Sequence, residues 1–124
     1  MENYKIAENA KIETKENIKK LKEELNTIVA PECRKYLLTL ICLNKNMYKF
    51  HTACSLYFRK SISRDVLIHK FKEVKIEYRN ITGDFMELSM ESCRDIEISE
   101  GMYLKICNQF KKDYEAIEEL EKNI

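Results

Sequence analysis

Glycine and proline are scarce in this 124-residue chain, which holds only Gly83, Gly101 and Pro31. A β-rich chain of this length needs many turns, and turns favour Gly, Pro, Asn and Asp. The shortage therefore argues against a sandwich or a barrel. The abundance of Lys, Glu, Leu and Ile favours helices joined by short loops. The length suits one domain, whose core can be large enough to fold without disulfides or metals.

Cysteine is present, but not in an arrangement that a disulfide framework or a zinc site requires. The five cysteines are an odd number, and no two of them form a C-x-x-C pair. No signal peptide is visible, because the first 28 residues are charged throughout. No apolar run approaches the roughly 18 residues of a membrane-spanning helix. We therefore expect a cytoplasmic, reducing location, no membrane contact, no metal, no cofactor, and free thiols that act as small core residues.

Apolar residues recur at alternating spacings of three and four, which is the pattern of amphipathic helices. Pro31 suits the first turn of a helix, and Ser61 or Ser63 and then Ser99 are good N-caps for later ones. The register is kept across Gly83, so we expect one continuous helix there. The sequence predicts helices over residues 3–29, 31–59, 63–92 and 99–123.

Three of the predicted helices carry a well-defined apolar stripe. The second has Cys33, Tyr36, Leu40, Leu43, Met47, Phe50, Cys54 and Tyr57. The third has Leu67, Phe71, Val74, Tyr78, Ile81, Phe85 and Leu88. The fourth has Tyr103, Ile106, Phe110, Ile117, Leu120 and Ile124, and its stripe is interrupted at Asp113, with Tyr114 beside it. Each stripe places its residues on one helix face, which is the predicted core.

These helices predict an all-α fold, in the form of an antiparallel up-down-up-down four-helix bundle with coiled-coil-like packing, over a single domain of residues 1–124. The first helix has only a narrow stripe that begins at Ile18, and its earlier pattern is poor. A three-helix core with a mobile N-terminal helix is therefore the alternative. A heptad stripe closes equally well within a monomer or across two copies, so a homodimer stays open.

Charge is divided by region, although the net charge is only +1. Residues 33–80 hold eleven basic and three acidic residues, whereas residues 81–124 hold five basic and eleven acidic ones. In one interpretation the basic second and third helices lie against the acidic fourth helix. In the other, the basic helices form a hairpin that binds nucleic acid or another polyanion. The candidate residues for that contact are Lys45, Lys49, Arg59, Lys60, Arg64, Lys70, Lys72, Lys75 and Arg79.

The fourth predicted helix also carries a cluster of acidic side chains. Its members are Glu115, Glu118, Glu119 and Glu121. Di-metal helical bundles use inward-facing Glu-x-x-His pairs, and this sequence has none. We therefore expect the cluster to face solvent or a partner protein.

Arg64 and His69 form an R-x4-H pattern. It resembles the R-x4-6-H motif of HEPN-domain ribonucleases, which are small helical proteins, over six residues. The resemblance implies that Arg64 stabilises phosphoryl charge and His69 moves a proton, at a site where two protomers meet. The other interpretation is a solvated helix start, with Asp65 near the positive end of the helix dipole.

His51 and Cys54 lie three residues apart and form the other pair with chemical potential, as a nucleophile pair or half of a metal site. The sequence places no further ligand beside them, so we expect a partly buried, hydrogen-bonded histidine. Gly-rich phosphate loops and Gly-x-Ser-x-Gly motifs are missing. The expected function is a non-enzymatic protein that binds or inhibits a larger protein, as accessory proteins of phages and viruses and immunity proteins do. The alternatives are a nucleic-acid-binding module and a HEPN-like ribonuclease.

Overall fold

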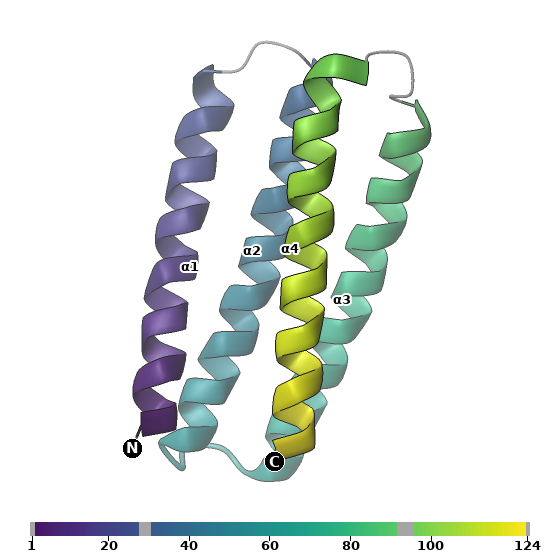
Figure 1. The fold of residues 1–124 in the computed structure, drawn as a ribbon. Helices are drawn as coiled ribbons and strands as arrows, with labels where there is room; N and C mark the ends of the chain where they lie inside the picture. Colours follow the sequence, from purple (N-terminus) through teal and green to yellow (C-terminus); the bar gives the residue numbers. More distant parts are fainter. Residues whose placement is uncertain (1, 28–30, 92–95, 124) are drawn as a thin grey trace.

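A computed structural model of the chain describes residues 2–27, 31–91 and 96–123. These residues form four α-helices and no strand, so the predicted all-α class is confirmed (Figure 1). The fourth helix begins three residues before its predicted start, and Ser99 therefore lies inside it instead of capping it. The helices are α1 (Glu2–Thr27), α2 (Pro31–Phe58), α3 (Arg64–Glu91) and α4 (Ile96–Asn123).

Helix α2 is the central helix, because α1, α3 and α4 all pack against it. Helix α4 touches α3 at few positions, and the described backbones of α1 and α4 do not approach one another closely. Figure 1 shows α4 in front of α2, with α1 and α3 on either side and both termini at the same end. The packing is consistent with a helical bundle, but one that is arranged around a single shared helix.

The predicted stripes form the core of the protein. The side chains of Cys33, Phe85, Leu88, Tyr103, Phe110 and Ile124 lie outside the described ones, and Tyr57 and Leu120 are half-buried. Burial of this many apolar side chains on one face of each helix is the main force that holds the helices together. The buried stripe residues are Tyr36, Leu40, Leu43, Met47, Phe50 and Cys54 of α2, Leu67, Phe71, Val74, Tyr78 and Ile81 of α3, and Ile106 and Ile117 of α4.

The connection between α2 and α3 is fixed by hydrogen bonds at both helix ends. Lys60 has a positive φ of 63°, the backbone amide of Lys60 donates to the Tyr57 carbonyl, and that of Ser61 donates to the Leu56 carbonyl. This pattern is a Schellman motif, which normally has glycine at the positive-φ position. Ser63 then caps α3, because its Oγ accepts a hydrogen bond from the Val66 amide at 3.3 Å.

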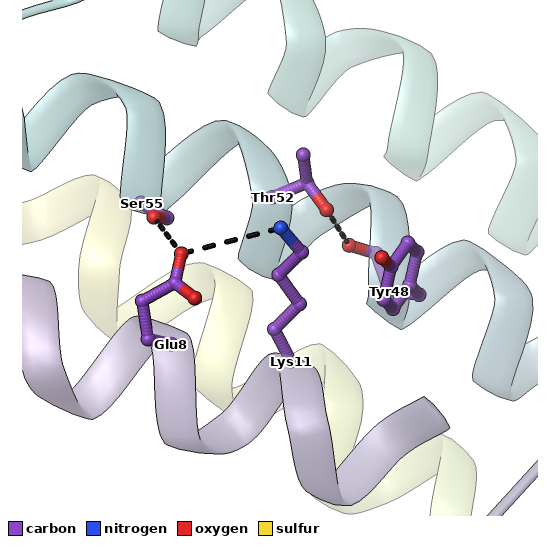
Figure 2. A network of polar contacts seen from close by, with 5 residues as sticks. All are labelled: Glu8, Lys11, Tyr48, Thr52 and Ser55. Atoms are coloured by element: carbon purple, nitrogen blue, oxygen red, sulfur yellow. Dashed lines mark hydrogen bonds and ion pairs between the residues drawn. The ribbon is translucent and has the colours of Figure 1, made fainter. Parts of the chain in front are cut away.

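Helix α1 packs against α2. Its Ala7 side chain is buried against α2. Glu8 and Lys11 point toward α2, where the Glu8 carboxylate accepts a hydrogen bond from Ser55 (Figure 2). The Arg59 guanidinium lies 5.0 Å from the ring centroid of Tyr4 and adds a second contact near the start of α1. No described helix is long and apolar enough to span a membrane.

Candidate functional site

A groove of about 310 Å³ lies between α1 and α4, with α2 as its floor. We call it the α1–α4 groove. Its walls are mostly apolar, and none of the described residues that line it is a lysine or an arginine. The lining residues are Asn3, Ile6, Ala7 and Ala10 of α1, Phe50, His51, Cys54 and Phe58 of α2, and Ala116, Glu119, Leu120 and Asn123 of α4.

The groove is open because small side chains line both of its walls. Ala7 and Ala10 on α1, and Ala116 on α4, are too short to bridge the two helices, whose backbones stay apart. Ile6 lines the groove and is 65% exposed, so a large aliphatic side chain stands in water at this site. An exposed apolar surface in a concave site is typical of a place where another molecule binds.

A second, more polar pocket of about 330 Å³ lies between the same three helices, nearer the C-terminal end of α1. Asn44 of α2 and Gln109 of α4 line it. The Gln109 amide also donates a hydrogen bond to Asp113 Oδ1 at 2.8 Å. The space between α1 and α4 is therefore lined by apolar residues near the chain termini and by more polar residues farther away.

His51 and Cys54 both line the α1–α4 groove, and burial favours the uncharged form of each. Burial raises the pKa of the Cys54 thiol to about 12 and lowers the pKa of the His51 imidazole. Since the thiolate is the nucleophilic form of cysteine, Cys54 is inert near neutral pH. The His51 ring packs edge-on against Phe50, with 5.3 Å between ring centroids. No set of three or more potential metal ligands occurs among the described side chains. The part of the groove formed by His51 and Cys54 is therefore uncharged near neutral pH, and its cysteine is not a nucleophile.

Arg64 and His69 lie on the exposed first turns of α3, away from the α1–α4 groove. His69 Nε2 is 3.1 Å from the Glu73 carboxylate, one helical turn later. Arg64 and His69 are five positions apart in the helix, which is about 1.4 helical turns. The structure thus places the R-x4-H residues on an accessible helix surface, with His69 in a local pair.

The basic candidate residues differ in their exposure and in the acidic residues near them. Lys75 bridges two acidic residues of α4, with its Nζ 3.4 Å from Glu118 and 2.5 Å from Glu121. The hydrogen bond to Glu121 is the largest cause of a raised Lys75 pKa. Here a basic α3 lies against an acidic α4, as the intramolecular interpretation predicts. The candidate side chains that remain exposed are Lys45, Lys49, Arg59, Lys60, Arg64, Lys70, Lys72 and Arg79.

A further groove, of about 450 Å³, runs between α2 and α3 and carries both signs of charge. Lys49 and Lys70 line it together with Glu73 and Glu77. Lys70 Nζ lies 3.6 Å from Glu73, so part of this positive charge is already compensated. This groove is larger than the α1–α4 groove, but its mixed charge points to no one class of ligand.

The acidic cluster of α4 is divided in the same way. Glu118 and Glu121 bind Lys75, whereas Glu115 and Glu119 are exposed and make no ion pair with the described residues. Glu119 lines the α1–α4 groove, and Glu115 lies one turn before it on the same helix. Two carboxylates of the predicted partner-facing cluster are therefore available beside the groove.

The sequence indicated Glu119, His51 and Cys54, but not the small residues that create the groove. Ile6, Ala7 and Ala10 belong to the stretch whose apolar pattern is poor, and Ala116 falls outside the α4 stripe. Their shared position is a consequence of how α1 and α4 pack on α2. Comparisons with family models, with curated proteins and with solved structures found no match to this chain.

Proposed function

We propose that this chain is a non-enzymatic protein that binds a larger protein partner, and that the α1–α4 groove is part of the binding surface. The observation that carries the proposal is the exposed Ile6 beside an apolar floor of Phe50 and Phe58. Grooves of this kind bind amphipathic segments of other proteins. The unreactive, protonated Cys54 thiol also favours binding over covalent chemistry.

The proposal includes the finer features of the predicted fold. We propose an antiparallel up-down-up-down order of the helices with coiled-coil-like packing, which Figure 1 supports, since the chain reverses between successive helices. In this arrangement the N-terminal half of α1 and the C-terminal half of α4 contact the partner.

Capture of partners by the immobilised protein tests the function. We expect a specific protein from the organism of origin to be retained at high salt by the native chain and lost by the Ala116→Trp variant, which fills the groove. Mass spectrometry identifies it. Retention of nucleic acid at low salt, with no protein that depends on Ala116, would contradict the proposal.

Nucleic-acid binding is the alternative proposal, supported by the exposed Lys45, Lys72 and Arg79. Contacts with phosphates weaken steeply as salt rises. An electrophoretic shift of RNA or DNA that is lost in a Lys72→Glu, Arg79→Glu double variant would establish this function. Cleavage of RNA that is lost in both Arg64→Ala and His69→Ala would instead establish the ribonuclease.

A further inference from the structure

We infer that the occupant of the α1–α4 groove is a basic amphipathic helix of the partner protein, with apolar anchors on one face and Lys or Arg beside them. The inference rests on the proposed function and specifies the chemistry of the partner at this one site. Shape, polarity and charge of the groove each contribute to it.

The shape of the groove suits a helix. Its walls are the helices α1 and α4, and its floor is α2, so a segment that enters it lies between long helices. Ala10 and Ala116 project little from the walls, which leaves room for large side chains of the occupant to reach Phe50 and Phe58. Helical ligands bind such grooves through apolar residues spaced three and four apart.

The polarity of the floor requires apolar anchors. Burial keeps the Cys54 thiol protonated, and the lowered pKa of His51 keeps its imidazole uncharged near neutral pH. A charged side chain placed over this floor would lose its hydration without gaining a counter-charge there. Leu, Ile, Phe or Met is therefore favoured at the centre of the contact.

The charge of the rim selects basic flanking residues. Glu119 lines the groove, and Glu115 lies one turn away, both without an ion pair among the described residues. An acidic segment or a nucleic-acid backbone would meet like charge here, whereas Lys or Arg of the occupant would find complementary charge. Glu118 and Glu121 do not contribute, because Lys75 already binds them.

A second copy of this chain is the main competing occupant. Helix α3 has its own exposed Ile76, which is 57% accessible and lies between exposed Lys72 and Arg79 on the helix surface. If that face of α3 bound the groove of another copy, the interface would join two different surfaces. Repeated interfaces of this kind form rings or open chains instead of a closed dimer. Self-association of this kind depends on concentration, so it can be measured separately.

Peptide binding to the full-length protein tests the inference. The probes are synthetic helical peptides of about 18 residues, or five turns. One has Leu on one face and Lys elsewhere, one has the same Leu positions and Glu elsewhere, and one is a scrambled Leu/Lys peptide. Fluorescence anisotropy at about 0.15 M salt, where the Debye length is about 8 Å, limits non-specific attraction. We expect the native chain to bind the amphipathic Leu/Lys peptide in preference to the other two.

Matched variants locate the binding site. Ala116→Trp should abolish binding of the Leu/Lys peptide, while Leu38→Trp, on the exposed outer face of α2, should leave it unchanged. Glu119→Lys should weaken binding about threefold to tenfold, as expected for a charge at the rim of an interface. Glu23→Lys makes the same change of charge on α1 away from the groove and should have little effect. Circular dichroism confirms that each variant is folded.

Several outcomes would overturn the inference. These are no binding of the Leu/Lys peptide, equal binding of the Leu/Glu peptide, and binding that survives Ala116→Trp. Light scattering that shows concentration-dependent multimers, lost in Ala116→Trp, would make a second copy the occupant. A captured partner that still binds the Ala116→Trp variant, and binds it at high salt, would support a protein-binding function. It would also show that the α1–α4 groove is not the binding site.

Discussion

The hydroxyl of Ser55 on α2 donates a hydrogen bond of 2.5 Å to the Glu8 carboxylate on α1. Lys11 lies one turn farther along α1, with its Nζ 4.0 Å from the same carboxylate and 5.7 Å from the centre of the Tyr48 ring (Figure 2). Glu8 follows Ile6 by two residues, so the two side chains point to nearly opposite sides of α1. The contact with Ser55 thus helps to fix which face of α1 lines the groove.

Removal of Glu8 should cost more stability than removal of Ser55. In Glu8→Ala the Ser55 hydroxyl stays buried and loses its partner, and we expect a loss of about 1–2 kcal/mol. In Ser55→Ala the carboxylate is still partly exposed and can bind water and Lys11, so the loss should stay below about 1 kcal/mol. Urea unfolding measures both. Glu16→Ala, an exposed change on the same helix, is the control, and an equal loss in all three variants would contradict the role of the contact.

Substitutions of a buried and an exposed leucine of α2 should differ in their effect on stability. Leu43 is 0% exposed and Leu38 is 49% exposed. We expect Leu43→Ala to lower the free energy of unfolding by about 2–5 kcal/mol, because it leaves a cavity at the centre of the bundle. Leu38→Ala should change it by less than about 0.5 kcal/mol. Thermal and urea denaturation give both values, and similar losses would mean that Leu38 is covered in solution.

The stripes of α2 and α3 could be predicted from the sequence because they depend on local periodicity. Tyr36 to Cys54 and Leu67 to Ile81 keep a spacing of three and four, and this spacing alone places them on one helix face. The groove could not be predicted, because it depends on where α1 and α4 lie around α2. Ala10 and Ala116 have too little apolar surface to mark a position in the sequence.

The interruption of the α4 stripe at Asp113 also had two possible structural outcomes. Tyr114 is the more apolar neighbour, but it lies about 100° farther around the helix than Asp113. In the structure Tyr114 is half exposed and Asp113 is buried. Ile106, seven residues before Asp113, and Ile117, four residues after it, are both buried on the core face and fix the rotation of the helix. The buried carboxyl gains the Gln109 amide as a hydrogen-bond donor.

Glycine at position 60 should stabilise the protein. Lys60 adopts a φ of 63° at the C-terminal end of α2, and a side chain at such a position costs about 1–2 kcal/mol. We expect Lys60→Gly to raise the free energy of unfolding by about 0.5–1 kcal/mol, since glycine adopts this conformation without a clash but is freer in the unfolded chain. Lys45→Gly, in the middle of α2, should instead lower it by about 1 kcal/mol. Urea denaturation of both variants checks the opposite signs.

Replacement of Asp113 by asparagine should stabilise the protein at neutral pH but not in acid. Asp113 is 5% exposed, and burial is the main cause that raises its pKa from 3.8 to about 6, with the Tyr78 hydroxyl and the Gln109 amide offsetting part of the rise. Below about pH 4 both the folded and the unfolded chain hold this proton. Between the two pKa values only the folded chain retains it, so stability falls as the pH rises, and above about pH 6 the full cost of the buried charge remains.

The rise in the Asp113 pKa corresponds to a cost of about 3 kcal/mol at pH 7, and Asp113→Asn should recover on the order of 1–3 kcal/mol of it. The neutral amide keeps an oxygen that can accept the hydrogen bond from Gln109. His51 has the opposite effect on how stability depends on pH. Burial lowers its pKa, so its contribution to the stability of the folded chain is lost as the pH falls below 6.5. Both proteins contain His51, so its effect cancels when their unfolding free energies are compared at each pH. A difference between the two proteins that is the same at about pH 4 and pH 7 would show that Asp113 is not held in the buried environment that raises its pKa.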